Sequence, residues 1–175
     1  MYDAEHIVVM PNNPNIIFTA NQAAELYTST PVHVLPTRSV VEGYAALSMA
    51  DPDSNSVEEL LNDMNDGFRD VITGYVTTAI RDTCLNDLNV QAGQYIGLSG
   101  KNILSVGIDK LETTKELICK IADPTTQEII LVFYGANASS GDVTLLQNFL
   151  QENYPNSDIG FIDGQQDIYD FIISL

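Results

Sequence analysis

Basic residues, cysteine, histidine and tryptophan are scarce in this sequence of 175 residues. It has seven lysine and arginine residues against 24 aspartate and glutamate residues, a formal net charge of −17, with two cysteines, two histidines and no tryptophan. This balance excludes a nucleic-acid-binding protein, because such proteins neutralise phosphates with basic side chains. It favours basic partners, although acidity that serves solubility alone would give the same composition.

Long apolar runs and paired cysteines are also missing. The longest apolar run, at residues 128–134, is far too short to cross a bilayer, so we expect no membrane insertion. The first six residues are acidic and polar, unlike a signal peptide. Cys84 and Cys119 lie far apart without metal-binding or redox spacing, so we expect both thiols to be reduced. These features predict a cytoplasmic protein.

The opening of the chain repeats a strand–loop–helix pattern. Apolar runs at residues 6–10 and 32–35 are typical of buried strands, and turn residues follow each of them. Asn13 followed by Pro14 marks the start of a helix, and residues 39–42 (Ser-Val-Val-Glu) fit a capping box at the start of another. Two such units in succession predict parallel strands covered by helices.

A break at Asp51–Asn55 divides the predicted fold into two lobes. An amphipathic helix over residues 57–72 follows, and its apolar side carries Leu60, Leu61, Met64 and Phe68. The predicted fold class is α/β, with a small parallel βαβα lobe at residues 1–55 and a mixed-sheet α+β lobe at residues 56–175. In the second lobe we expect strands at 75–80, 94–98, 103–106, 129–134, 159–162 and 169–173 and helices at 111–122 and 142–153.

Motifs that carry catalysis or metal binding do not occur in the sequence. It contains no G-x-x-x-x-G-K-[ST] or G-x-G-x-x-G phosphate loop, no G-x-S-x-G elbow and no H-E-x-x-H helix. His6 and His33 have no partners at metal-ligand spacing. We therefore predict neither catalytic residues nor metal ligands in this chain.

Polar loops remain as the candidate binding elements. Residues 12–15 and 37–39 each follow a strand and open a helix, and a third such loop spans residues 135–140. Helix N-termini at the carboxyl ends of parallel strands offer free N–H groups to a ligand. Arg38 stands in one of these loops, and Arg81 follows another predicted strand. Ordinary helix capping, or pairing of Arg81 with a nearby aspartate, would account for the same residues.

Five motifs resemble the dihydroxyacetone-kinase-like fatty-acid kinase A-subunit, in its carboxy-terminal domain. They read Pro-Asn-Asn-Pro-Asn-Ile from Pro11, Leu-Pro-Thr-Arg-Ser from Leu35, Gly-Tyr-Val-Thr-Thr-Ala-Ile-Arg-Asp-Thr from Gly74, Gly-Gln-Tyr-Ile-Gly-Leu from Gly93, and Tyr-Gly from Tyr134. The terminal Asp-Gly-Gln-Gln-Asp-Ile-Tyr of residues 163–169 departs from the family's Gly-Gly-Gln-Pro-x-Tyr.

The resemblance implies a DegV-like fold, a truncated first lobe and a division of labour. It implies that ATP and magnesium bind a separate amino-terminal kinase domain of the same polypeptide. It further implies that the present chain docks a DegV-type fatty-acid-binding protein whose acyl carboxylate is phosphorylated. No cofactor is then expected in this chain. The candidate binding residues are Asn12, Asn13, Asn15, Thr37, Arg38, Ser39, Arg81, Asp82, Thr83, Gly164 and Gln165.

Two other interpretations stay open. The loops could bind a dihydroxyacetone-like or phosphate-like small molecule in an enzyme of the dihydroxyacetone kinase family, which requires a concave pocket that excludes water. A purely structural or oligomerising domain would instead leave the activity of the full-length kinase unchanged when Arg38 or Arg81 is replaced by alanine.

Overall fold

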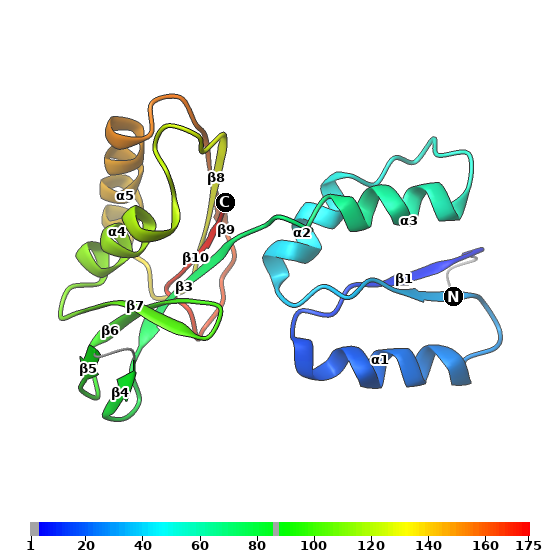
Figure 1. The fold of residues 1–175 in the computed structure, drawn as a ribbon, viewed down its shortest axis with the longest axis horizontal. Helices are drawn as coiled ribbons and strands as arrows, with labels where there is room; N and C mark the ends of the chain where they lie inside the picture. Colours follow the sequence, from blue (N-terminus) through cyan, green and yellow to red (C-terminus); the bar gives the residue numbers. More distant parts are fainter. Residues whose placement is uncertain (1–3, 86–87) are drawn as a thin grey trace. The chain divides into compact units, whose positions relative to one another are not determined.

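The chain forms two compact units, Met1–Val71 and Ile72–Leu175, in a computed structural model that describes residues 4–85 and 88–175. Figure 1 shows the elements of each unit in chain order. Helices and strands are mixed in both, which confirms the predicted α/β class with a small parallel sheet and a larger mixed one. Among the described residues, none of the helices has the length and apolar content that a membrane crossing requires.

The first unit has three layers, with a pair of parallel strands as the middle layer and helices on both sides. Strands β1 (Ile7–Val9) and β2 (Val32–Val34) pair in parallel, as the repeated pattern predicted, with Val8 opposite His33. Helix α1 (Pro14–Leu26) covers one side of the pair, and α2 (Val40–Ser48) and α3 (Val57–Asp66) cover the other (Figure 1).

The helices of the first unit begin at capping residues. Asn13 caps α1 by accepting a hydrogen bond from the N–H of Asn15, and Pro14 follows at the first helical position. Ser39 caps α2 by accepting from the N–H of Glu42. The Glu42 carboxylate accepts from the N–H of Arg38 instead of that of Ser39, so only half of the predicted capping box forms.

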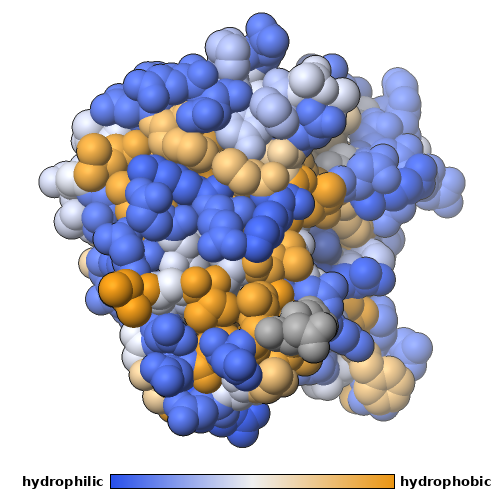
Figure 2. Space-filling model, turned by 60° about the vertical axis from the view of Figure 1, so that its left-hand side comes forward, coloured by the Kyte–Doolittle hydropathy of each residue, from blue (hydrophilic) through white to orange (hydrophobic). Residues whose placement is uncertain are grey.

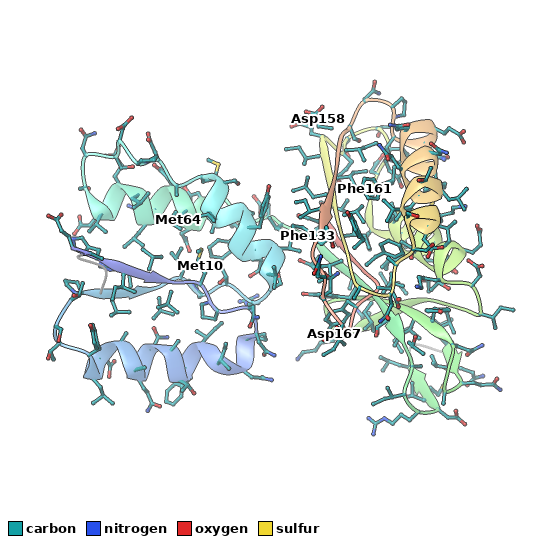
Figure 3. The ribbon with its side chains drawn as sticks, turned by 180° about the vertical axis from the view of Figure 1, so that it is seen from behind. Met10, Met64, Phe133, Asp158, Phe161 and Asp167 are labelled. Atoms are coloured by element: carbon teal, nitrogen blue, oxygen red, sulfur yellow. The ribbon has the colours of Figure 1, made fainter. Side chains whose placement is uncertain are left out.

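The core of the first unit lies between the strand pair and the helices α2 and α3. Leu35, Ala46 and Met64 are its buried members. Met10, from the end of β1, and Met64, from α3, lie on the same side of the strands (Figure 3). Because α3 packs on α2 in this core, the division of the chain falls after Val71 and not at Asp51–Asn55, where the sequence predicted it.

Helix α1 is less deeply packed. Ile17, Ala20 and Ala24, which lie on one face of the helix, are half-buried, and no residue of the helix is fully buried. Phe18 and Leu26 are 71% and 84% exposed. The apolar stripe of this helix is therefore narrow and consists mainly of small side chains.

The second unit is built on a six-stranded sheet in the order β7-β6-β3-β10-β8-β9. Neighbouring strands are antiparallel except β8 and β9, which are parallel. The strands are β3 (Thr73–Thr78), β6 (Tyr95–Ser99), β7 (Asn102–Gly107), β8 (Ile129–Tyr134), β9 (Asp158–Asp163) and β10 (Phe171–Ser174).

Helices α4 (Lys110–Ile121) and α5 (Ser140–Asn153) cover one face of this sheet (Figure 1). Phe161 of β9 points toward these helices, whereas Phe133 of β8 points to the opposite face (Figure 3). The main core lies between sheet and helices, and its fully buried side chains include Val76, Leu117, Ile118, Ile130, Val132, Leu146, Leu150, Phe171 and Ile173.

A small hairpin beside the sheet was not predicted. Strands β4 (Thr83–Leu85) and β5 (Leu88–Val90) pair antiparallel, so Thr83 belongs to a strand and not to a loop. Val90 and Leu88 pack on Ile103 and its neighbours in a second cluster. All three residues of β4 are exposed, so the segment lacks the alternation of buried and exposed side chains that identifies a strand in a sequence.

Candidate functional site

Two of the predicted loops meet in the first unit. Because β1 and β2 are parallel, residues 10–15 and 35–39 leave the strand pair at the same edge. The hydroxyl of Thr37 donates a hydrogen bond of 2.6 Å to the carbonyl of Pro11, and Thr37 is fully buried. The structure thus brings the Asn12–Asn15 and Thr37–Ser39 segments together, as the parallel arrangement predicted.

The residues of these loops divide into inward and outward groups. Thr37 and Ser39 are buried and hold the loops, whereas Asn12, Asn15 and Arg38 are exposed. Within the described residues, Arg38 forms no ion pair: the paired cations there are Arg69, Lys110, Lys115 and Lys120. Its exposed guanidinium can bind an anion as a fork.

A shallow apolar depression adjoins these loops. It has a volume of about 500 Å³ and lies between the end of β1 and helix α1. Met10, Pro11 and Asn12 line one side, and Ile16, Thr19 and Ala20 line the other. The depression is open to solvent along α1, so it does not provide the water-excluding pocket that a small-molecule enzyme site requires.

The remaining predicted residues lie in the second unit. Strands β3, β7, β8 and β9 all end at one edge of the sheet, where β10 begins; we call it the carboxyl edge. Arg81 and Asp82 follow β3 there, and Gly164 and Gln165 follow β9. The structure therefore places both predicted groups at this edge, on a different unit from the Arg38 loops.

Several of these residues have structural roles. The Asp82 carboxylate accepts a hydrogen bond of 2.8 Å from the N–H of Ala92, which joins the start of the β4–β5 hairpin to its end. The N–H of Gly164 donates to the carbonyl of Tyr134, and Gln165 has a positive φ of 49°. Arg81 is exposed and forms no ion pair in the described part of the chain. Whether any of them binds a ligand stays a prediction.

Sequence reasoning missed the ion pair at the carboxyl edge. Lys110 Nζ lies 2.9 Å from Asp170 Oδ1 and donates a hydrogen bond of 2.6 Å to the carbonyl of Asn137. The ring of Tyr95 lies 5.7 Å from the same nitrogen. A lysine at the first position of a helix interacts unfavourably with the helix dipole, and the carboxylate of Asp170 offsets this.

Metal-binding side chains do not cluster in the described part of the chain. Among the residues described there, no group of three or more His, Cys, Asp or Glu side chains could hold a metal ion. His6 Nδ1 and His33 Nε2 lie 3.1 Å apart and form a hydrogen bond with each other. The sequence also contains no phosphate-loop motif.

Comparison with known proteins assigns the chain. The family model for the C-terminal domain of FakA-like proteins, which are named for the A-subunit of fatty acid kinase, matches residues 1–175. The chain belongs to this family.

Protein YloV of Bacillus subtilis (strain 168) is 30% identical over 172 residues, which are 98% of this chain and 31% of that protein. Uncharacterized protein SAR1202 of Staphylococcus aureus (strain MRSA252) is 32% identical over 169 residues, 96% of this chain and 30% of that protein. This FakA-like domain thus spans about a third of the length of these relatives.

Solved structures share the fold of this FakA-like domain. The DegV family protein Cg2579 of Corynebacterium glutamicum matches with a TM-score of 0.65 and 16% identity, over 97% of this chain and 74% of that one. The Streptococcus pneumoniae fatty acid kinase (Fak) B3 protein, loaded with linoleic acid, matches with a TM-score of 0.65 and 14% sequence identity. The match covers 98% of this chain and 72% of that one. The dihydroxyacetone kinase of C. freundii, in complex with AMP-PNP and Mg²⁺, matches with a TM-score of 0.61 and 12% sequence identity. The match covers 95% of this chain and 37% of that one.

Proposed function

We propose that this FakA-like domain docks a DegV-type fatty-acid-binding protein, so that the acyl carboxylate can be phosphorylated by a kinase domain elsewhere in the longer protein. ATP and magnesium would then bind that kinase domain, as the family resemblance implies, and the sequence of this chain contains no phosphate-loop motif. Membership of the FakA-like family of fatty acid kinase supports a role in this reaction.

The observation that carries the proposal is the position of Arg38 at the meeting point of two helix starts, without an ion pair among the described residues. Its loop is held by the buried Thr37 hydroxyl, so the guanidinium is displayed from a fixed backbone. Exposed Asn12 and Asn15 stand in the neighbouring loop. Such a group can form charge-assisted hydrogen bonds with a carboxylate on the surface of a partner protein. Arg81 displays a second exposed guanidinium at the carboxyl edge.

The test is calorimetric titration of the chain with a purified DegV-type fatty-acid-binding protein, with ATP·Mg²⁺ as the control ligand. We expect the partner to bind and ATP not to bind. Arg38→Ala should weaken binding of the partner by about tenfold or more, since an arginine at an interface commonly carries this much of the affinity. No binding of the partner by the folded chain would overturn the proposal.

Arg69→Ala is the matched control. Arg69 is also exposed and in the first unit, but it pairs with Asp66, one turn away on the same surface. The two substitutions change the net charge equally, so long-range attraction changes equally in both. Equal loss of affinity in the two variants would show that Arg38 acts only through net charge and would contradict a specific contact.

A further inference from the structure

Three isoleucines are the most exposed large apolar residues that the structure describes in the second unit. Ile80, Ile108 and Ile168 are 94%, 87% and 73% exposed. Isolated exposed apolar residues are common on protein surfaces, but a group of them in one place marks an interaction site. Whether these three isoleucines mark an interaction site therefore depends on where they lie in the fold.

All three isoleucines lie at the carboxyl edge of the sheet. Ile80 follows the end of β3, Ile108 follows the end of β7, and Ile168 precedes β10, which begins at the same edge. Strands β7 and β10 lie on either side of the β6–β3 pair, so the three positions fall within four adjacent strands. Figure 2 shows several apolar groups, separated by polar side chains, in the lower half of the face in view.

Hydrogen bonds hold the backbone beside Ile168 and Ile80. The hydroxyl of Thr77 donates a hydrogen bond of 2.6 Å to the carbonyl of Ile168, and the N–H of Asp170 donates to the carbonyl of Val76. The N–H of Ala79, next to Ile80, donates to the carbonyl of Gln94. Apolar groups displayed on a fixed backbone lose little conformational entropy when a partner covers them, which favours binding.

The surface beside Ile108 is acidic. A depression of about 410 Å³ is lined by Ile108, Asp109, Glu112 and Glu116, with Lys115 as its basic residue. Lys115 pairs with Glu112, and Glu116 pairs with Lys120, which does not line the depression. Asp109 caps helix α4 and accepts from the N–H of Glu112, so its charge is not neutralised by an ion pair in the described part of the chain. The depression therefore favours a cationic side chain.

We propose that Ile80, Ile108 and Ile168 form an apolar docking patch for the DegV-type fatty-acid-binding protein, and that the depression beside Ile108 accepts a lysine or arginine of that protein. This inference rests on the proposed function and adds, on the second unit, a surface that takes part in the docking. Charge argues against a second copy of this chain as the occupant, since two chains of net charge −17 repel each other, and the acidic lining of the depression suits a basic side chain of the partner.

The experiment measures the affinity of the DegV-type protein for the wild-type chain and for the triple variant Ile80→Ser, Ile108→Ser and Ile168→Ser. The matched control is the double variant Ile129→Ser and Leu145→Ser. These residues are 54% and 55% exposed, but Ile129 begins β8 at the opposite edge of the sheet and Leu145 lies on α5. Circular dichroism establishes that each variant is folded.

We expect the triple variant to bind about tenfold or more weakly and the control variant to bind within about twofold of wild type. Glu116→Lys, which puts a cation at the depression, should weaken binding and slow association at low salt. Binding of the triple variant with wild-type affinity would overturn the patch while leaving the proposed function intact. Absence of binding by the wild-type chain would instead overturn the proposed function, and the patch with it.

Discussion

Lys110 Nζ lies 2.9 Å from Asp170 Oδ1, and the two side chains are only 14% and 8% exposed. This ion pair joins the start of α4 to the residue before β10, and Lys110 also holds the carbonyl of Asn137 in the loop after β8. Three segments that are distant in the sequence therefore meet at one ammonium group.

Asp170→Ala should destabilise the second unit by about 3–5 kcal/mol, because it leaves the Lys110 charge nearly buried without its counter-ion. Urea unfolding followed by circular dichroism measures the change. Glu116→Ala is the control: it breaks the Lys120–Glu116 pair, whose side chains are 45% and 48% exposed, and should cost less than about 1 kcal/mol. Equal losses of stability in the two variants would contradict the expectation that the buried pair matters more than the exposed one.

Gly135→Ala should detach the loop before β10 from the end of β8. A Cβ at this position would collide with the carbonyl oxygen of Tyr169 and would lie 2.6 Å from that of Gln166. The N–H of Ala136 donates to the same Gln166 carbonyl, so we expect its protection from hydrogen exchange to fall. Unchanged protection of the Ala136 N–H from hydrogen exchange would show that the backbone accommodates the methyl group without losing this bond.

Gly141→Ala is the matched control for this substitution. Gly141 lies in the first turn of α5, where the nearest atom to an added Cβ is the Ser139 hydroxyl oxygen at 3.6 Å. The substitution creates no clash and removes a helix-destabilising glycine, so it should stabilise the second unit by about 0.5–1 kcal/mol.

Local signals in the sequence predicted most of the elements. Strand β8 was predicted at its observed bounds, because a continuous run of apolar β-branched and aromatic residues lies between polar segments. The caps of α1 and α2 were predicted because Asn13 and Ser39 are good caps whose positions follow turn residues. The parallel pairing of β1 and β2 followed from the helix between them.

The order of strands in the second sheet was beyond local signals. Strand β10 is the last in the chain, yet it lies between β3 and β8, with all four residues buried. Nothing in four consecutive residues indicates their neighbours, because pairing depends on contacts between segments far apart in the sequence. The Lys110–Asp170 pair and the gathering of the three isoleucines both follow from that order, so the sequence could not predict them either.

The candidate site was predicted in its parts but not in its grouping. The loops at Asn12–Asn15 and Thr37–Ser39 were expected to meet and do so, since the parallel pair was predicted correctly. Gly164 and Gln165 share an edge with Arg81, which required the position of β10 between β3 and β8. Their binding roles, carried over from the family resemblance, stay predictions.

Thr37→Val should destabilise the first unit by about 1–3 kcal/mol. Valine keeps the shape of the fully buried threonine but leaves the Pro11 carbonyl without the hydroxyl that donates to it. Ser48→Ala, which removes an exposed hydroxyl bonded to the Ala45 carbonyl, should change stability by less than about 0.5 kcal/mol. Thermal unfolding compares the two variants, and a loss in Thr37→Val no larger than in Ser48→Ala would contradict a role for this bond.

Stability should fall in alkaline solution because of Tyr154. Burial, with the Cys119 sulfur beside the hydroxyl, raises the pKa of Tyr154 to about 12. The unfolded chain releases this proton near pH 10, so the folded state holds it more tightly than the unfolded state does. The resulting stabilisation is complete below pH about 10 and is lost as the pH rises toward 12.

Denaturant midpoints at pH 9 and pH 11 measure this loss, with Tyr154→Phe as the control that removes the titrating hydroxyl. We expect the midpoint of wild type to fall more between the two pH values than that of Tyr154→Phe. Cys119→Ala should keep most of the wild-type difference, since burial is the larger cause of the raised pKa. If Cys119→Ala abolished the fall in midpoint between pH 9 and pH 11, the thiol and not burial would be its cause. If the midpoints of wild type and Tyr154→Phe fell equally, groups other than Tyr154 would be its cause.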